Sequence, residues 1–186
     1  MRIAVWGLVV ACLALPAGAQ ECFAGKPGKV SFDDGRVITV IQRHGDDLTY
    51  TEPYAGFQDI VRKTHLMLFL KTARAGARAT EYRWTTRLPK LSLMVPGYHF
   101  DLKGTMKSGD GKALPYRRTG DVLGQEVMKV GDCPYDVVKI RTETFMDGQL
   151  IDVSTDYLSP DLMIVLRSEI IPDGAKQIAR NVVAIE

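Results

Sequence analysis

The sequence predicts an all-β fold: an antiparallel meander curled into a barrel or half-barrel, forming a single domain with one disulfide. Short runs rich in β-branched and aromatic residues recur along the chain, and Gly, Asp and Pro separate them at the spacing of hairpin turns. This pattern predicts roughly nine to eleven strands. A meander of this length is expected to curl, because unpaired strand edges recruit other chains.

The first half of the chain consists of short strands joined by tight turns. Gly45-Asp46 is a two-residue hairpin signal, so the runs on either side of it are expected to pair. Ile60–Thr72 is ambiguous, because its apolar stretch Leu66–Leu70 fits a buried helix and a buried strand equally well. The missing helix caps and the strand-rich surroundings favour one buried strand. The other strands of this half are expected at residues 29–32, 36–44, 47–52, 79–86 and 99–106.

The second half contains the clearest hairpin of the sequence. Residues 135–145 alternate between two faces, and Asp147-Gly148 favours a tight turn into a returning strand. The residues expected to share one face are Val138, Ile140, Thr142 and Thr144. Arg117–Val130 contains Gly120 and Gly124, so we expect either two short strands or one bulged strand there. The remaining strands are expected at 149–158, 162–171 and 178–185.

The N-terminus has the features of an export signal. Arg2 precedes an apolar run, Ile3–Leu15, and Ala17-Gly18-Ala19 matches an A-x-A cleavage site. The run is too short to span a bilayer, and no stop-transfer segment follows it. We therefore predict a signal peptide at residues 1–19, cleaved near Ala19, and a periplasmic β-rich domain at residues 20–186 that does not span a membrane.

The three cysteines divide between this leader and the mature chain. Cys12 lies in the apolar run and is expected to leave with the signal peptide; the alternative is a lipid-modified Cys12, because Val9–Cys12 loosely resembles a bacterial lipobox. Cys22 and Cys133 remain, and an exported protein with two cysteines most simply pairs them. Such a disulfide closes a loop of about 110 residues, for which the chain-entropy model predicts a stabilisation of about 4–5 kcal/mol.

The net charge gives no reason to expect a nucleic-acid partner. The whole chain has a formal charge of +2, which falls to +1 without Arg2. Residues 71–118 nevertheless hold eleven Lys and Arg against three Asp and Glu. This excess is typical of solvated strand faces, and it also fits a basic surface for an anionic envelope partner. The residues predicted to form that surface are Arg83, Arg87, Arg117 and Arg118.

No sequence motif assigns a catalytic or metal-binding residue. The H-E-x-x-H, P-loop, EF-hand, G-x-S-x-G and S-x-x-K patterns are absent. His44 is followed closely by two aspartates, but this spacing is typical of a hairpin turn. Ser108 has Asp110 nearby, and a triad with His99 would require all three to meet in space. We expect no enzymatic activity, no cofactor and no metal.

The region between Cys133 and Arg167 combines the predicted hairpin with a short motif. The hairpin is followed by Tyr157-Leu158-Ser159-Pro160-Asp161-Leu162 and then by Val165-Leu166-Arg167, which fits the pattern Y-x-S-P-x-L-x-x-V-x-R. In this the chain resembles periplasmic β-rich domains of Gram-negative bacteria, some of which are likened to the curved half-barrel of lipoprotein carriers. The resemblance implies a curved β fold and a periplasmic location, and it implies no activity because the pattern contains no catalytic residue.

Export, the strand pattern and the absence of catalytic motifs together favour a non-enzymatic periplasmic binding protein. A curled sheet encloses a concavity, and the scattered aromatic and Met side chains are candidates to line it. We expect a hydrophobic or amphipathic envelope component, such as a lipid, as the ligand. The alternative is an envelope-associated interaction or structural protein that uses the basic surface between Lys71 and Arg118.

Overall fold

Twelve strands form a closed barrel in which each strand pairs antiparallel with its neighbours along the chain, and β1 pairs with β12 to close the sheet. The computed structural model describes residues 22–23, 27–54, 57–74, 77–173 and 175–186, and outside the strands these residues contain one short 3₁₀ helix, η1 (Leu91–Leu93). The predicted antiparallel all-β meander is confirmed, and it closes into a barrel. The strands are β1 (Lys29–Phe32), β2 (Val37–His44), β3 (Asp47–Tyr54), β4 (Phe57–His65), β5 (Leu68–Arg74), β6 (Ala77–Trp84), β7 (His99–Ser108), β8 (Leu114–Val130), β9 (Cys133–Met146), β10 (Gln149–Ser159), β11 (Ile164–Pro172) and β12 (Ile178–Ile185).

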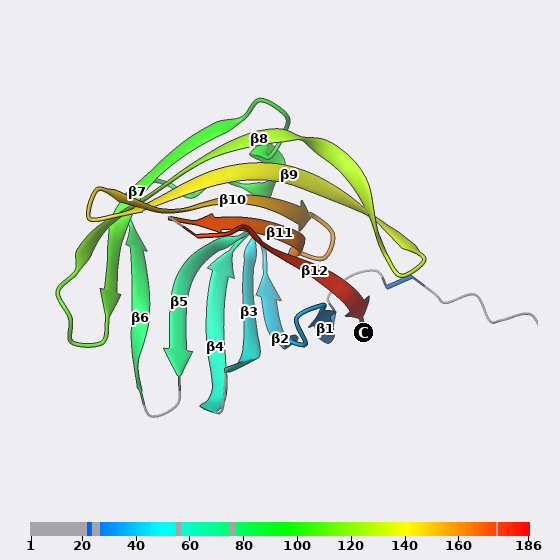
Figure 1. The fold of residues 1–186 in the computed structure, drawn as a ribbon, viewed down its shortest axis with the longest axis horizontal. Helices are drawn as coiled ribbons and strands as arrows, with labels where there is room; N and C mark the ends of the chain where they lie inside the picture. Colours follow the sequence, from blue (N-terminus) through cyan, green and yellow to red (C-terminus); the bar gives the residue numbers. More distant parts are fainter. Residues whose placement is uncertain (1–21, 24–26, 55–56, 75–76, 174) are drawn as a thin grey trace, which may run out of the picture.

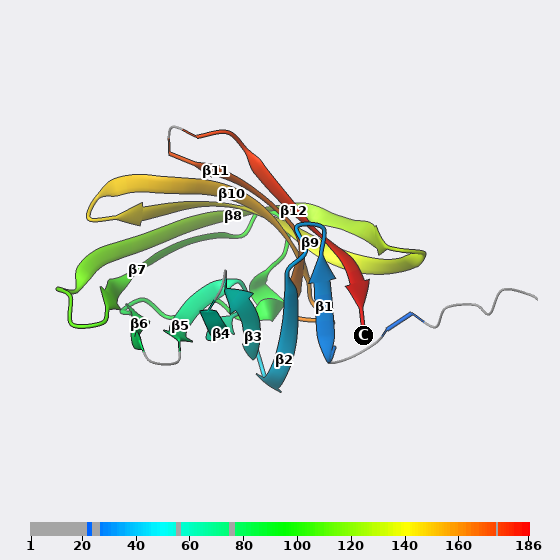
Figure 2. The ribbon, with the colours of Figure 1, turned by 60° about the horizontal axis from the view of Figure 1, so that its bottom comes forward.

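The barrel is flattened into two walls. In Figures 1 and 2, strands β8–β12 arch over strands β2–β6. The β6–β7 pair connects the walls on one side, and the β1–β12 pair connects them on the other. We call the two facing parts of the barrel the β1–β5 wall and the β8–β11 wall. Alternate side chains of each strand point inward, so the two walls meet across the interior.

The β9–β10 hairpin follows the predicted pattern. Its turn residues Asp147 and Gly148 have φ angles of 51° and 82°, the left-handed conformation that an Asp-Gly turn favours. Thr142 and Thr144 of β9 are only 1% and 2% exposed. The predicted shared face is confirmed as the inward one, and it places two hydroxyl groups inside the barrel.

The apolar stretch at residues 66–70 is where the sequence prediction is wrong. The single strand expected at Ile60–Thr72 is a hairpin, in which a two-residue turn joins β4 to β5. Leu66 has a φ of 52°, and both turn residues, Leu66 and Met67, are buried. This turn lacks polar turn residues, because its side chains pack into the core at one end of the barrel. The additional hairpin explains why the barrel has twelve strands and not nine to eleven.

One end of the barrel is closed by buried side chains. Because the strands run up and down in turn, the β2–β3, β4–β5, β6–β7 and β10–β11 connections lie at this end. His65, at the end of β4, links the first three of these connections: its Nδ1 lies 2.7 Å from an Asp47 carboxylate oxygen and its Nε2 lies 2.8 Å from the Pro89 carbonyl oxygen. The core cluster at this end includes Leu66, Met67, Met94, Phe100 and Met163. The opposite end is the candidate mouth.

β8 is one long bulged strand, which is one of the two arrangements predicted for residues 117–130. Its register with β9 shifts between Val122 and Gly124, and pairing continues on both sides of the shift. Gly120 lies against the ring of Phe100, since a Cβ built on this glycine would come within 2.2 Å of the Phe100 Cζ atom. The glycine therefore makes the room that the buried Phe100 ring occupies.

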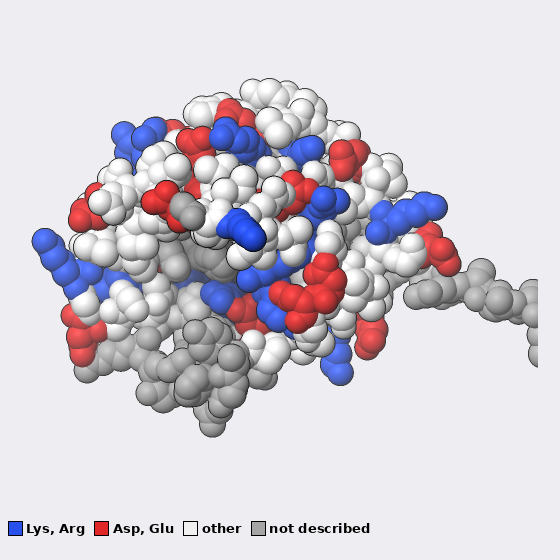
Figure 3. All heavy atoms as spheres, viewed as in Figure 1, with Lys and Arg blue, Asp and Glu red and all other residues white. Residues whose placement is uncertain are grey.

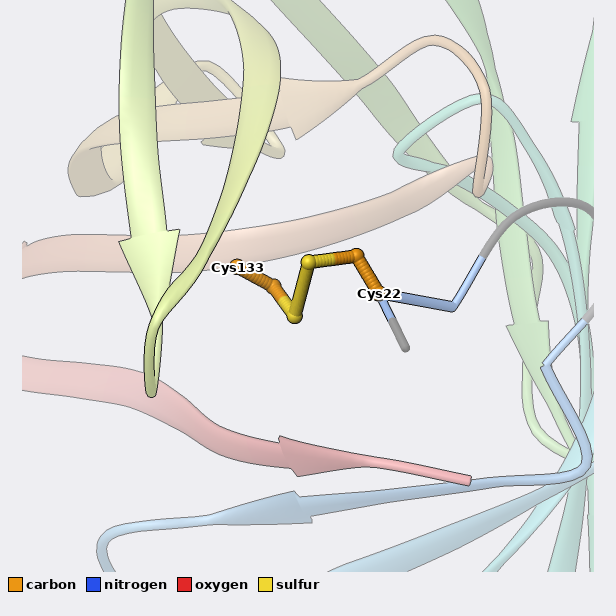
Figure 4. Close-up of a disulfide and its surroundings, with 2 residues drawn as sticks. All are labelled: Cys22 and Cys133. Carbon is orange, nitrogen blue, oxygen red and sulfur yellow. A yellow bond between two sulfur atoms is a disulfide. The ribbon is translucent and has the colours of Figure 1, made fainter. Parts of the chain in front are cut away.

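The predicted disulfide between Cys22 and Cys133 is confirmed. Cys22 precedes β1 and Cys133 begins β9, so the bridge fastens the segment before the barrel to the tip of the β8–β9 hairpin (Figure 4). The two Cα atoms are 5.2 Å apart, and the cysteines are separated by 111 positions along the chain. The predicted signal peptide, its cleavage site near Ala19 and Cys12 lie outside the described residues.

Candidate ligand cavity

A partly open cavity of about 260 Å³ lies inside the barrel, between the two walls. Its lining changes from apolar near the closed end to charged near the mouth. The apolar floor consists of Leu48, Leu66, Met67, Phe69, Met163 and Ile164. The charged residues toward the mouth are Arg36, Glu52, Asp152 and Arg180. Between floor and mouth, the β8–β11 wall contributes Arg118, Ser154, Asp156 and Ser168.

Cross-strand pairing brings these polar residues of the β8–β11 wall together. Arg118 of β8 pairs with Thr144 of β9, which pairs with Asp152 of β10, so the three form one row across the sheet. Alternate residues of each strand share a face, and the next inward rows add further polar side chains. We call five of these residues the polar cluster: Arg118, Thr142, Ser154, Asp156 and Ser168.

The polar cluster is hydrogen-bonded around one buried carboxylate. Arg118 Nη2 donates to Thr142 Oγ1 at 2.9 Å and lies 3.3 Å from Asp156 Oδ2. Ser154 donates to the same Asp156 oxygen at 3.1 Å, and Ser168 donates to Asp156 Oδ1 at 2.5 Å. Arg118 is 8% exposed and Asp156 is 6% exposed. Both Asp156 oxygens are therefore satisfied within the barrel.

Three further arginines in the barrel are paired with carboxylates. Arg62 contacts Glu52, and Arg36 Nη1 lies 3.8 Å from the second Glu52 oxygen. Arg36 Nε also lies 2.8 Å from Asp34 Oδ2, and Arg180 Nε lies 3.4 Å from that oxygen. Figure 3 shows basic and acidic side chains adjoining on this face of the molecule. The mouth is therefore highly polar, while its charges largely compensate one another.

Tyr50 lines the cavity, and its hydroxyl group shows how burial there affects a titratable side chain. Burial, together with the neighbouring Glu52 carboxylate, raises the pKa of the Tyr50 hydroxyl from 10.0 to about 12. Burial likewise raises the pKa of Tyr116, on β8, to about 12. The interior of the barrel thus disfavours a charged group that lacks a compensating partner.

We expect the protein to lose stability between pH 10 and pH 12. A tyrosine whose pKa is higher in the folded state stabilises the fold fully below its unfolded value of 10.0, and this contribution disappears as the pH rises toward about 12. Two pKa units correspond to about 2–3 kcal/mol. Urea unfolding of wild type and Tyr50→Phe, from about pH 8 to pH 11.5, measures this. The variant should lose less stability with rising pH, and parallel stability curves would contradict the expectation.

Three of the four arginines predicted to form a basic surface lie outside the barrel. Arg83 and Arg87 are exposed, and Arg117 Nε forms an ion pair with Asp101 at 2.8 Å. The surface prediction is wrong for Arg118, which points into the cavity. Consecutive residues of a strand face opposite sides, so Arg117 and Arg118 do not share a surface. An anionic partner for the exposed three stays a prediction.

His65 and His99 have structural side-chain partners, and the catalytic grouping considered from the sequence is not assembled. Ser108 and His99 lie at opposite ends of β7, which places them roughly 30 Å apart at the rise of an extended strand. His99 Nδ1 lies instead 2.8 Å from Asp121 Oδ1. Within the described part of the chain, no group of three or more His, Cys, Asp or Glu side chains is placed to hold a metal ion.

Fold and cavity together define a class: a closed twelve-stranded antiparallel barrel with an apolar floor and a polar mouth. Among solved structures, the chain is similar to the hypothetical lipoprotein YmcC from Escherichia coli K12, with a TM-score of 0.55 and 10% sequence identity. The match covers 88% of this chain and 89% of that one. It shows a shared fold, in agreement with the resemblance to Gram-negative β-rich domains.

No family model and no curated protein matches the chain. In the described residues, no helix has the length and apolar character needed to cross a membrane.

Proposed function

We propose that this protein is a non-enzymatic periplasmic binding protein that holds a hydrophobic or amphipathic envelope molecule inside its barrel. The observation that carries the proposal is the graded lining of the cavity. A chain-like molecule can bury its apolar part against the floor of Leu48, Met67 and Met163, while its polar end lies beside the polar side chains between the floor and the mouth.

The polar cluster supports a binding role over a purely structural one. Moving a charged pair into the protein interior costs several kcal/mol of lost hydration, which apolar side chains of similar size avoid. A barrel that needs only a solid core gains little from Arg118 and Asp156 in that position. A barrel that receives a partly polar ligand gains a hydrogen-bonding wall beside an apolar one.

The disulfide supports the proposed location. Bridges such as Cys22–Cys133 form and persist in oxidising compartments, of which the bacterial periplasm is one. The fold shared with a hypothetical lipoprotein and the export signal predicted at residues 1–19 favour the same compartment.

Native mass spectrometry of the protein, purified from the periplasm without detergent, tests the proposal directly. A bound molecule of defined mass, released on denaturation and extractable into organic solvent, is the expected result. A homogeneous ligand-free protein that also takes up no apolar probe would contradict the proposal.

A matched pair of substitutions on β2 locates the binding site. Ile38 is 5% exposed and lines the cavity, whereas its neighbour Val37 is 38% exposed on the outer face. Ile38→Trp is expected to fill the cavity and abolish most uptake of N-phenylnaphthylamine, a neutral fluorescent probe, because the added ring takes the ligand's volume. Val37→Trp should bind like wild type. Equal binding by both variants, each shown to be folded by circular dichroism, would place the site elsewhere.

A further inference from the structure

We propose that the ligand of this cavity is a single-chain amphiphile with an anionic head group, a carboxylate or phosphate, and that Arg118 binds this head group. The inference rests on the proposed function and adds the chemical class of the ligand. It starts from the hydrogen-bonding capacity that the polar cluster leaves unused.

Arg118 has more donors than the polar cluster occupies. A guanidinium carries five N–H groups. Nε and Nη2 of Arg118 contact Thr142, Ser154 and Asp156, whereas Nη1 has no hydrogen-bond partner among the described residues. Asp156, in contrast, accepts bonds at both of its oxygens. The cluster therefore presents spare donors, and no spare carboxylate oxygen, on the wall of the cavity.

An anion is the group that benefits most from these donors. A charge-assisted hydrogen bond to a guanidinium is about twice as strong as a neutral one, and it strengthens where water is excluded. Arg118 is 8% exposed, and its neighbours Asp156 and Tyr116 are 6% and 8% exposed, so little water surrounds the guanidinium. The planar fork of Arg also matches the geometry of carboxylate and phosphate oxygens.

Asp152 is the group that opposes an anionic ligand, and it makes the inference sharply testable. It lines the cavity in the same row as Arg118, and it has no ion pair among the described residues. A carboxylate in this position repels an anion and attracts a cation. Replacing Asp152 by Asn must therefore change the affinity in opposite directions for anionic and cationic ligands.

The cavity volume limits the ligand to one chain. An engineered apolar cavity of about 150 Å³ in another protein holds a benzene molecule. The cavity here, at about 260 Å³, is less than twice that size, and its floor is formed by side chains as flexible as Met67 and Met163. One alkyl chain fits such a space, whereas two parallel chains do not.

The experiment measures dissociation constants of the ligand-free mature protein for four probes by calorimetry. Decanoate, decyl phosphate, decanol and decyltrimethylammonium share one chain and differ in the head group. We expect the two anions to bind at least about tenfold more tightly than decanol. Acetate and inorganic phosphate are expected to bind at least about tenfold more weakly than their decyl counterparts, which distinguishes an amphiphile from a free anion.

Three variants assign the head group to Arg118. Arg118→Gln/Asp156→Asn removes the cationic guanidinium without leaving an unpaired carboxylate, and it should bind decanoate about tenfold more weakly while binding decanol unchanged. Asp152→Asn should bind decanoate about threefold more tightly. Arg117→Gln is the control, because this neighbour points outward and pairs with Asp101. If the double variant does not fold, the direction in which Asp152→Asn changes the affinity for decanoate still tests whether the cavity prefers an anionic head group.

The outcomes separate this inference from the proposed function. Equal affinity for all decyl head groups leaves a binding barrel but overturns the role of Arg118. Tighter binding of decyltrimethylammonium, weakened by Asp152→Asn, overturns the anionic class in favour of a cationic one. If no decyl compound binds, the proposed function fails as well.

Discussion

Replacing Cys22 and Cys133 by alanine is expected to lower the free energy of unfolding by about 4 kcal/mol, a large share of the stability of an ordinary domain. The bridge closes a loop of more than a hundred residues and so removes much conformational freedom from the unfolded chain. It also holds the segment before β1 against the tip of the β8–β9 hairpin, next to the β1–β12 seam that closes the barrel. Loss of the bridge therefore weakens the point where the two ends of the sheet meet.

Urea unfolding of the mature protein, with and without reductant, measures this effect. The oxidised wild type should unfold at a higher urea concentration than the double variant, and the reduced wild type should behave like the double variant. The double variant itself should not respond to reductant, since its mature chain has no cysteine. Coincident curves for oxidised and reduced wild type would show that the bridge does not stabilise the barrel.

Substituting Arg118 alone is expected to destabilise the barrel by about 3–5 kcal/mol, more than removing both members of the ion pair. Arg118→Met leaves Asp156 as a carboxylate at 6% exposure without its cationic partner. Ser154 and Ser168 still donate to Asp156, but two neutral hydrogen bonds do not replace a buried cation. In Arg118→Met/Asp156→Leu no charge is left buried, so most of the lost stability should return.

The double-mutant cycle isolates the coupling between the two side chains. Free energies of unfolding are measured for wild type, both single variants and the double variant at neutral pH. The expected coupling is about 2 kcal/mol or more, because each single substitution leaves the other charged group buried without its partner. Arg117→Met, on the exposed face of the same strand, should change stability by less than about 1 kcal/mol. Strictly additive single effects would show that Arg118 and Asp156 do not act as a pair.

Local signals were enough to predict the hairpins that polar turns define. Asp147-Gly148 and Gly45-Asp46 form the expected hairpin turns, because Gly and Asp favour turn conformations whatever residues surround them. The inward face of β9 was equally readable, since apolar and β-branched residues alternate with charged ones along it. The β4–β5 turn was missed for the converse reason. Leu66 and Met67 have no turn preference of their own, and only the core that they enter bends the chain there.

The candidate site was far less predictable than the fold. The apolar floor and the exposed Arg83 were within reach of sequence reasoning, but the polar cluster was not. Arg118, Ser154 and Asp156 are ordinary polar residues in strands whose outer faces are polar too. A strand that is polar on both faces gives no local sign of which side will be enclosed. The alternation from Arg117 to Thr119 could have shown that the adjacent arginines face opposite ways, but not which one faces inward.

The sequence by itself determined an all-β meander and the pairing of Cys22 with Cys133, because turn chemistry, strand alternation and cysteine number are properties of short segments or simple counts. Only the tertiary structure decided that Arg118 lies inside beside Asp156, in a cavity whose floor includes Leu48 and Met163. Which face of a strand is buried depends on how the whole sheet curves and closes. That closure is set by contacts between residues far apart in the chain, such as β1 with β12, and no local pattern contains them.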